Sequence, residues 1–156
     1  MSDTDGKSPT ESILAIDRKA PVQCELDISI DASPKKVWAV LSKVSDWHNW
    51  MDMITASRLE GELTPGSIVY WSIAGMDIRS RLAEVNAGRR LAWQGTDGAH
   101  VGIHIWDLKP QGNGTLLRNS ESIHGAENPA DHQEKLIAAL TYWNQALKTK
   151  VESQLS

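Results

Sequence analysis

The chain has 156 residues and a mass of 17.2 kDa, which fits a single domain with a sizeable core. A net charge of −4 and the lack of an apolar run near ~18 residues argue against nucleic acid as a partner and against membrane insertion. Cys24 is the only cysteine, so we expect no intrachain disulfide and no cysteine-based zinc site. We also expect no other metal site and no cofactor, and we predict a cytoplasmic location.

The start of the chain is polar and predicts a flexible arm over residues 1–19, although the ILAI stretch at 13–16 is apolar enough to dock. We expect residues 20–156 to form one domain. Apolar and polar residues alternate from Val22 to Ile30, which predicts a strand with one solvent-exposed face. Ser33 and Pro34 have the residue types of a helix start, and SDWHNW at 45–50 predicts a second short helix.

The middle of the chain predicts about six antiparallel strands. Turn signals separate them at Pro65-Gly66, Ala74-Gly75, Ala87-Gly88, Asp97-Gly98 and the QGNG stretch at 111–114. From residue 131 onward, apolar residues recur at spacings of three and four, which predicts a long amphipathic helix. Its apolar stripe consists of Leu136, Leu140, Trp143, Leu147 and Val151.

Estimated hairpin registers divide the strand residues between two faces. The QGNG loop is predicted to set His104 opposite Glu121 and Trp106 opposite Asn119. The apolar face, which we expect inside, holds Val69, Trp71, Ile73, Ile78, Leu82, Leu91, Trp93, Trp106, Leu108, Leu117 and Ile123. The polar residues predicted on the same face are Ser80, Glu84, His104, Asn119 and Glu121.

Three further registers follow from the turn positions. A two-residue turn at Asp97-Gly98 sets Trp93 opposite Gly102. A turn at 74–76 sets Trp71 opposite Ser80, and the turn at 87–88 sets Leu82 opposite Trp93.

A buried imidazole and a buried carboxylate require an explanation, because burying either group unpaired costs several kcal/mol, roughly. Two alternatives remain open. His104 and Glu121 satisfy each other inside a packed core, or they line a cavity that a polar group visits.

The order of several motifs resembles one superfamily. These motifs are IDASPKKVWAVLSKVSDWHNWMD, LTPGSIVYW, RLAWQG, HIWDLKP followed by GNGT, and ESIHG. They are similar to the SRPBCC, or START-like and birch-pollen-allergen-like, helix-grip superfamily over residues 22–152, and most of all to its bacterial polyketide cyclase/dehydrase-like branch. The resemblance implies an α+β helix-grip fold: a curved antiparallel β-sheet wrapped around a long C-terminal α-helix, with two short helices after the first strand.

The resemblance also implies a deep, mostly apolar cavity between sheet and helix, with a hydrophobic small molecule such as a lipid or polyketide as partner. We expect indoles to form stiff walls of such a cavity. The candidate ligand-binding residues are Trp71, Ser80, Leu82, Trp93, Trp106, Asn119, Trp47, Trp50, Leu140 and Trp143. For Trp47, Trp50 and Trp143, together with Trp38, the alternative is that they fill space around the helices. Trp47, His48 and Trp50 are also candidates for a lid.

Two functions stay open. The first is binding of a hydrophobic or aromatic molecule. The second is a cyclase or dehydratase in which His104 acts as general acid or base, Glu121 orients it, and Asn119 or an indole N–H holds a carbonyl oxygen. His100 and His104 lie ~13 Å apart along a strand, too far to share a metal ion.

Overall fold

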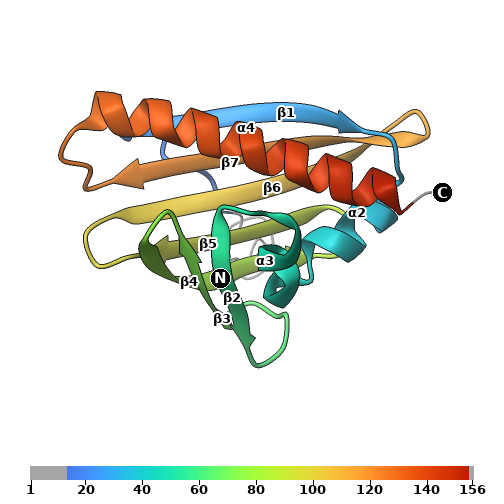
Figure 1. The fold of residues 1–156 in the computed structure, drawn as a ribbon, viewed down its shortest axis with the longest axis horizontal. Helices are drawn as coiled ribbons and strands as arrows, with labels where there is room; N and C mark the ends of the chain where they lie inside the picture. Colours follow the sequence, from blue (N-terminus) through green and yellow to red (C-terminus); the bar gives the residue numbers. More distant parts are fainter. Residues whose placement is uncertain (1–13, 155–156) are drawn as a thin grey trace, which may run out of the picture.

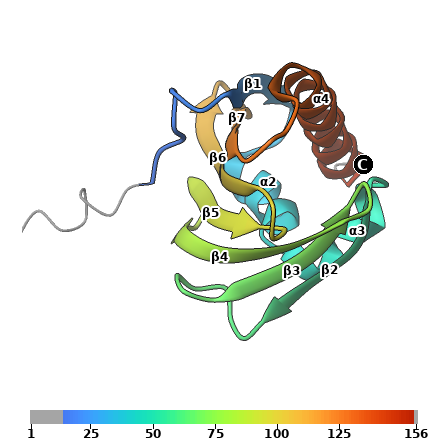
Figure 2. The ribbon, with the colours of Figure 1, turned by 90° about the vertical axis from the view of Figure 1, so that its left-hand side faces the viewer.

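The computed structural model describes residues 14–154, which fold around one curved antiparallel sheet (Figure 1). The elements are β1 (Val22–Ile30), α2 (Pro34–Leu41), the 3₁₀ turn η1 (Val44–Asp46), α3 (Trp47–Trp50), β2 (Ile54–Glu60), β3 (Ile68–Ile73), β4 (Met76–Asn86), β5 (Arg90–Thr96), β6 (Val101–Gln111), β7 (Gly114–His124) and α4 (Pro129–Ser153). The strand order is β1-β7-β6-β5-β4-β3-β2. The sheet bends around α4, so the predicted α+β helix-grip fold is confirmed (Figure 2).

The helices begin where the sequence places their caps. The Ser33 side chain accepts a hydrogen bond from the Lys36 backbone N–H at 3.4 Å, and Pro34 opens α2. The predicted second short helix is present as η1 followed by α3. Asn128 caps α4, whose five predicted stripe residues are all buried.

None of the helices within residues 14–154 is long and apolar enough to cross a bilayer, and the cytoplasmic location stays a prediction.

Two hairpin registers match the prediction and two differ by two residues. His104 lies opposite Glu121, and Leu82 lies opposite Trp93, as predicted. Trp93, however, pairs with His104, because the carboxylate of Asp97 accepts hydrogen bonds from the backbone N–H groups of Ala99 and His100 and lengthens the loop.

At the β3–β4 hairpin, Ala74 and Gly75 both have positive φ and form a two-residue turn, so Trp71 lies opposite Ile78 and not opposite Ser80. A shift of two residues leaves every side chain on its predicted face, because the side-chain period of a strand is two. The assignment of faces in these hairpins therefore survives the errors in register.

Glu84 was predicted on the inner face, and this prediction is wrong. A β-bulge between Leu82 and Glu84 shifts the register of β4 against β5, which turns Glu84 to the outer face. There its carboxylate accepts a hydrogen bond from Arg90 Nε at 2.8 Å. The bulge thus replaces a buried unpaired charge by an ion pair at the sheet surface.

A cluster of indoles fills the space between the inner face of the sheet, α3 and the middle of α4. The Trp47 ring centroid lies 5.2 Å from that of Trp93 and 5.3 Å from that of Trp143. Trp71 lies 5.5 Å from Trp143. Trp47 is fully buried, and its Nε1 donates to the backbone carbonyl of Leu41 at 3.0 Å. These rings hold α3 and α4 against the sheet.

Residues 1–13 of the predicted arm lie outside the described residues, and the remainder runs over the outer face of the sheet (Figure 2). Ile16 is buried against Ala92 and Ile105. The Leu14 backbone N–H donates to Glu84 Oε1 at 3.0 Å, and Arg90 donates to the Leu14 carbonyl. Leu14 and Ile16 of the ILAI stretch therefore pack on the side of the sheet opposite to α4.

Candidate functional site

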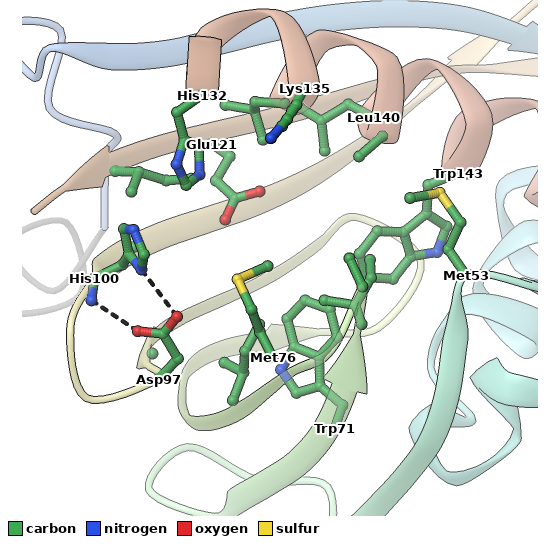
Figure 3. A pocket seen from close by; sticks show the side chains of 18 of the residues that line it. Met53, Trp71, Met76, Asp97, His100, Glu121, His132, Lys135, Leu140 and Trp143 are labelled. Atoms are coloured by element: carbon green, nitrogen blue, oxygen red, sulfur yellow. Dashed lines mark hydrogen bonds and ion pairs between the residues drawn. The ribbon is translucent and has the colours of Figure 1, made fainter. Parts of the chain in front are cut away.

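A pocket of about 720 Å³ lies between the inner face of the sheet and the N-terminal half of α4 (Figure 3). Its lining is mostly apolar and aromatic. The sheet contributes Trp71, Ile73, Met76, Ile78, Trp93 and Ile123, the loop before β2 contributes Met53, and α4 contributes Leu136, Leu140 and Trp143. Such a lining favours an apolar occupant.

Polar side chains gather at one end of the pocket, where the β5–β6 loop approaches the start of α4. His100 Nδ1 lies 2.9 Å from Asp97 Oδ2, and its ring centroid lies 5.0 Å from that of His132 (Figure 3). Burial opposes the ionisation of Asp97, but the hydrogen bonds from His100 and Ala99 outweigh it and lower the pKa of Asp97 to about 2. This end of the pocket is therefore polar and charged, unlike the rest.

Glu121 of β7 is the carboxyl group inside the apolar part, and it points toward the centre of the pocket (Figure 3). Its side chain is 17% exposed. Burial raises the pKa of Glu121 to about 8, so at neutral pH the group is mainly a neutral acid that can donate a hydrogen bond. Gly102 makes room for it, because a Cβ at that position would lie 3.3 Å from Glu121 Oε2.

His104 of β6 lies directly behind Glu121, in the core. Its Nδ1 is 3.4 Å from Glu121 Oε1, and its Nε2 is 2.6 Å from Asn119 Oδ1. The ring lies between Trp93, at 4.7 Å between centroids, and Trp106, at 5.5 Å. Burial lowers the pKa of His104 to about 4, so the imidazole is neutral at neutral pH.

A serine hydroxyl and a pair of glycines shape the sheet side of the pocket. Trp71 Nε1 donates to Ser80 Oγ at 3.0 Å, which fixes the plane of the indole. Gly95 and Gly102 are paired across β5 and β6, and both line the pocket. A Cβ at Gly95 would stand 2.4 Å from Ser80 Oγ, closer than any real contact. The absence of two side chains leaves bare backbone at this part of the wall.

The structure brings some of the predicted site residues together and separates others. The predicted residues that line the pocket are Trp71, Ser80, Trp93, Glu121, Leu140 and Trp143. Those buried behind the lining are Trp47, Leu82, His104, Trp106 and Asn119. Trp50 lies elsewhere and borders a second hollow of about 370 Å³ beside Tyr142.

Several residues at the site were not predicted. Asn144 is buried and its Oδ1 accepts a hydrogen bond from Asn119 Nδ2 at 2.9 Å. A signal for it exists, because residue 144 lies four after Leu140 and three before Leu147, within the apolar stripe. His132 is on the same helix, but nothing in its spacing distinguishes it from a solvated residue.

Solved structures with the same fold are similar to most of this chain. A hypothetical protein from Helicobacter pylori is 16% identical with a TM-score of 0.72, covering 89% of this chain and 97% of its own. A protein from Thermus thermophilus is 14% identical with a TM-score of 0.70, covering 86% and 99%. The di-domain ARO/CYC StfQ from the steffimycin biosynthetic pathway is 11% identical with a TM-score of 0.73, covering 85% of this chain and 51% of its own.

No curated protein sequence matches the chain. One family model does match, over residues 21–152, which is most of the chain and all of the strands. The model describes polyketide cyclases, dehydrases and lipid transport proteins. The pocket, the curved sheet and this match agree, and the chain belongs to the polyketide cyclase/dehydrase and lipid transport family.

Proposed function

We propose that the protein binds a hydrophobic or aromatic small molecule, lipid-like or polyketide-like, in the pocket between the sheet and α4. The observation that carries this proposal is a pocket of about 720 Å³ with an apolar, indole-rich wall and one carboxyl group, Glu121, in its interior. Pockets that bind small molecules span about 300–1,000 Å³ and combine apolar walls with a few polar groups in the same way.

The polar and aromatic groups indicate how such a ligand is held. Trp71, Trp93 and Trp143 offer indole surfaces against which a flat or extended apolar molecule packs. Glu121, protonated at neutral pH, donates a hydrogen bond to a neutral acceptor such as a ligand carbonyl. The bare backbone at Gly95 and Gly102 lets the ligand approach the sheet closely.

Filling the pocket tests the proposal. Ala139 lines the pocket from α4, and Ala139→Trp should weaken binding of Nile red, a neutral hydrophobic dye, by at least tenfold, equivalent to about 1.4 kcal/mol. Ile137 lies on the exposed side of the same helix, so Ile137→Trp is the matched control and should bind as the native protein does. Dye emission during titration measures both affinities. Equal affinities in the two variants would contradict binding in this pocket.

A second candidate function is a cyclase or dehydratase, because Glu121 presents its carboxyl to the pocket with His104 behind it. In this arrangement the roles are reversed from the sequence-based hypothesis. Glu121 is the acid or base that reaches the ligand, and His104 orients it. A shaped, dry pocket accelerates an intramolecular aldol closure because it folds the substrate into a reactive conformer.

Turnover and affinity separate the two functions. For an enzyme, Glu121→Gln and His104→Ala should abolish turnover of a linear poly-β-ketone thioester while dye affinity stays within about tenfold. For a binding protein, the native chain shows no turnover of the same thioester. Native mass spectrometry of the protein purified from its own host identifies any retained molecule.

A further inference from the structure

Three hydrogen bonds and one close contact connect the backbone of β1 to Glu121 in the pocket wall. Asn144 Nδ2 donates to the Leu26 carbonyl at 3.4 Å, and Asn119 Nδ2 donates to Asn144 Oδ1 at 2.9 Å. Asn119 Oδ1 lies 2.6 Å from His104 Nε2, and His104 Nδ1 lies 3.4 Å from Glu121 Oε1. The chain links α4, β7 and β6, with its far end in the pocket wall.

The direction of these hydrogen bonds is fixed at one end. A backbone carbonyl can only accept, so Asn144 must turn its NH₂ group toward Leu26 and its oxygen toward Asn119. Asn119 then turns its NH₂ group toward Asn144 and its oxygen toward His104. Because that oxygen is also only an acceptor, His104 Nε2 must carry a hydrogen.

The other nitrogen of His104 follows from the first. His104 is 1% exposed, and an uncharged ring carries a single N–H. With the hydrogen on Nε2, Nδ1 has a free lone pair, and among residues 14–154 it has no hydrogen-bond partner of ordinary geometry. Glu121 Oε1 lies 3.4 Å from this nitrogen, and a hydrogen shared between the two atoms has to come from the carboxyl group because Nδ1 carries none.

We propose that Asn119 and Asn144 are positioning residues that hold His104 in its Nε2–H tautomer, so that Nδ1 accepts a hydrogen bond from the protonated Glu121 carboxyl group. The amide chain thereby keeps Glu121 protonated, with its acid group at the pocket surface. In the ligand-free protein the single O–H of Glu121 is directed to His104, and its turning toward a ligand carbonyl instead rests on the proposed function. The tautomer itself does not depend on any ligand.

The opposite arrangement is well defined and gives the proposal a clear alternative. If both amides were turned over, His104 would carry its hydrogen on Nδ1 and donate it to an ionised Glu121. The two oxygens of Asn144 and Leu26 would then face each other at 3.4 Å without a hydrogen between them. The carbonyl of Leu26 is thus the atom that selects the tautomer.

Other titratable groups near Glu121 come from every element packed around it. Cys24 of β1 is its Cα partner, and burial raises the pKa of that thiol, so it is neutral at neutral pH. Asp131, His132 and Lys135 of α4 and Asp97 and His100 of the β5–β6 loop line the same pocket. A ligand-free titration of Glu121 therefore reports on His104 together with these rim charges.

Nitrogen-15 NMR of the ligand-free, full-length protein tests the proposal directly, because protonated and unprotonated ring nitrogens resonate far apart. At pH 7 the His104 spectrum, assigned by its loss in His104→Gln, should show a protonated Nε2 and an unprotonated Nδ1. A protonated Nδ1 with a bare Nε2, or an imidazolium with both protonated, would overturn the proposal. This measurement needs no variant of the amide chain and no ligand.

Asn144→Leu tests the role of the amides. It removes the link to Leu26 and frees Asn119 to turn over, so the Nδ1 resonance should move toward the protonated position and the titration midpoint of Glu121 should fall. Thr115→Val is the matched control, because it removes a buried hydrogen bond to the Ala32 carbonyl that does not involve Asn144, Asn119 or His104. It should change neither the Nδ1 resonance of His104 nor the titration midpoint of Glu121. Unchanged His104 resonances in folded Asn144→Leu would refute the positioning role.

These outcomes are separate from those of the dye titration. A native protein that binds no dye but shows the Nε2–H tautomer contradicts the proposed function and leaves the positioning role intact. A protein that binds dye with the opposite tautomer contradicts the positioning role alone.

Discussion

Replacing Glu121 by glutamine should remove a fall in stability that the native protein shows between about pH 6.5 and 8. Burial raises the pKa of Glu121 from its ordinary 4.5 to about 8, so the folded protein holds this proton over a range in which the unfolded chain has lost it. Its contribution to stability is therefore complete below pH 4.5 and declines as the pH rises to about 8.

His104 has the opposite effect over a lower range. Burial lowers the pKa of His104 from its ordinary 6.5 to about 4, so between these values the unfolded chain binds a proton that the folded protein does not. Stability from this group rises with pH up to 6.5 and is then constant. The two slopes offset each other below pH 6.5, and only the decline due to Glu121 remains above it.

The magnitude follows from the width of that window. One pH unit corresponds to about 1.4 kcal/mol for a single proton, so one and a half units correspond to about 2 kcal/mol. Urea unfolding followed by tryptophan emission at pH 6.5, 7.2 and 8.0, roughly, measures the free energy of unfolding at each pH. Glu121→Gln should lose this decline, whereas Glu62→Gln, an exposed glutamate, should keep it. An equal decline in native protein and Glu121→Gln would refute the reasoning.

Two further predictions concern packing, and urea unfolding checks both. Gly95→Ala places a methyl group against Ser80 Oγ and should lower the free energy of unfolding by ~1–3 kcal/mol. Adding Ser80→Ala should recover part of this loss. A double variant whose loss equals the sum of the two single losses would contradict this contact. Leu147→Ala in the buried stripe of α4 should lower the free energy of unfolding by ~2–5 kcal/mol. Ile137 is 41% exposed on the same helix, so Ile137→Ala should change it by no more than ~0.5 kcal/mol. Similar losses in the two variants would argue against the observed orientation of α4.

The sequence predicts the faces of the sheet better than it predicts which residues are opposite one another. Alternation with a period of two survives a register error of two residues, so Trp71 and Trp93 are correctly placed inside despite wrong partners. A bulge changes the count by one, and no residue type marks it, which is why Glu84 was placed on the wrong face.

How deeply a side chain is buried is harder to predict from the sequence than the face of the sheet on which it lies. His104 and Glu121 are neighbours on one face, but alternation does not indicate which of them reaches the pocket. The answer depends on the position of α4, whose Asn144 accepts a hydrogen bond from Asn119, the partner of His104. A contact between a strand and a helix 25 residues later is not visible in local sequence patterns.

The path of the segment from Leu14 to Ala20 has a practical consequence for handling the protein. This segment runs over the outer face of the sheet (Figure 2), and Leu14 and Ile16, the neighbours of the exposed Ala15, pack there, so the sheet lies between this segment and the pocket. A tether attached at Ala15 should hold the molecule on a biosensor chip with its binding side turned toward the flowing liquid.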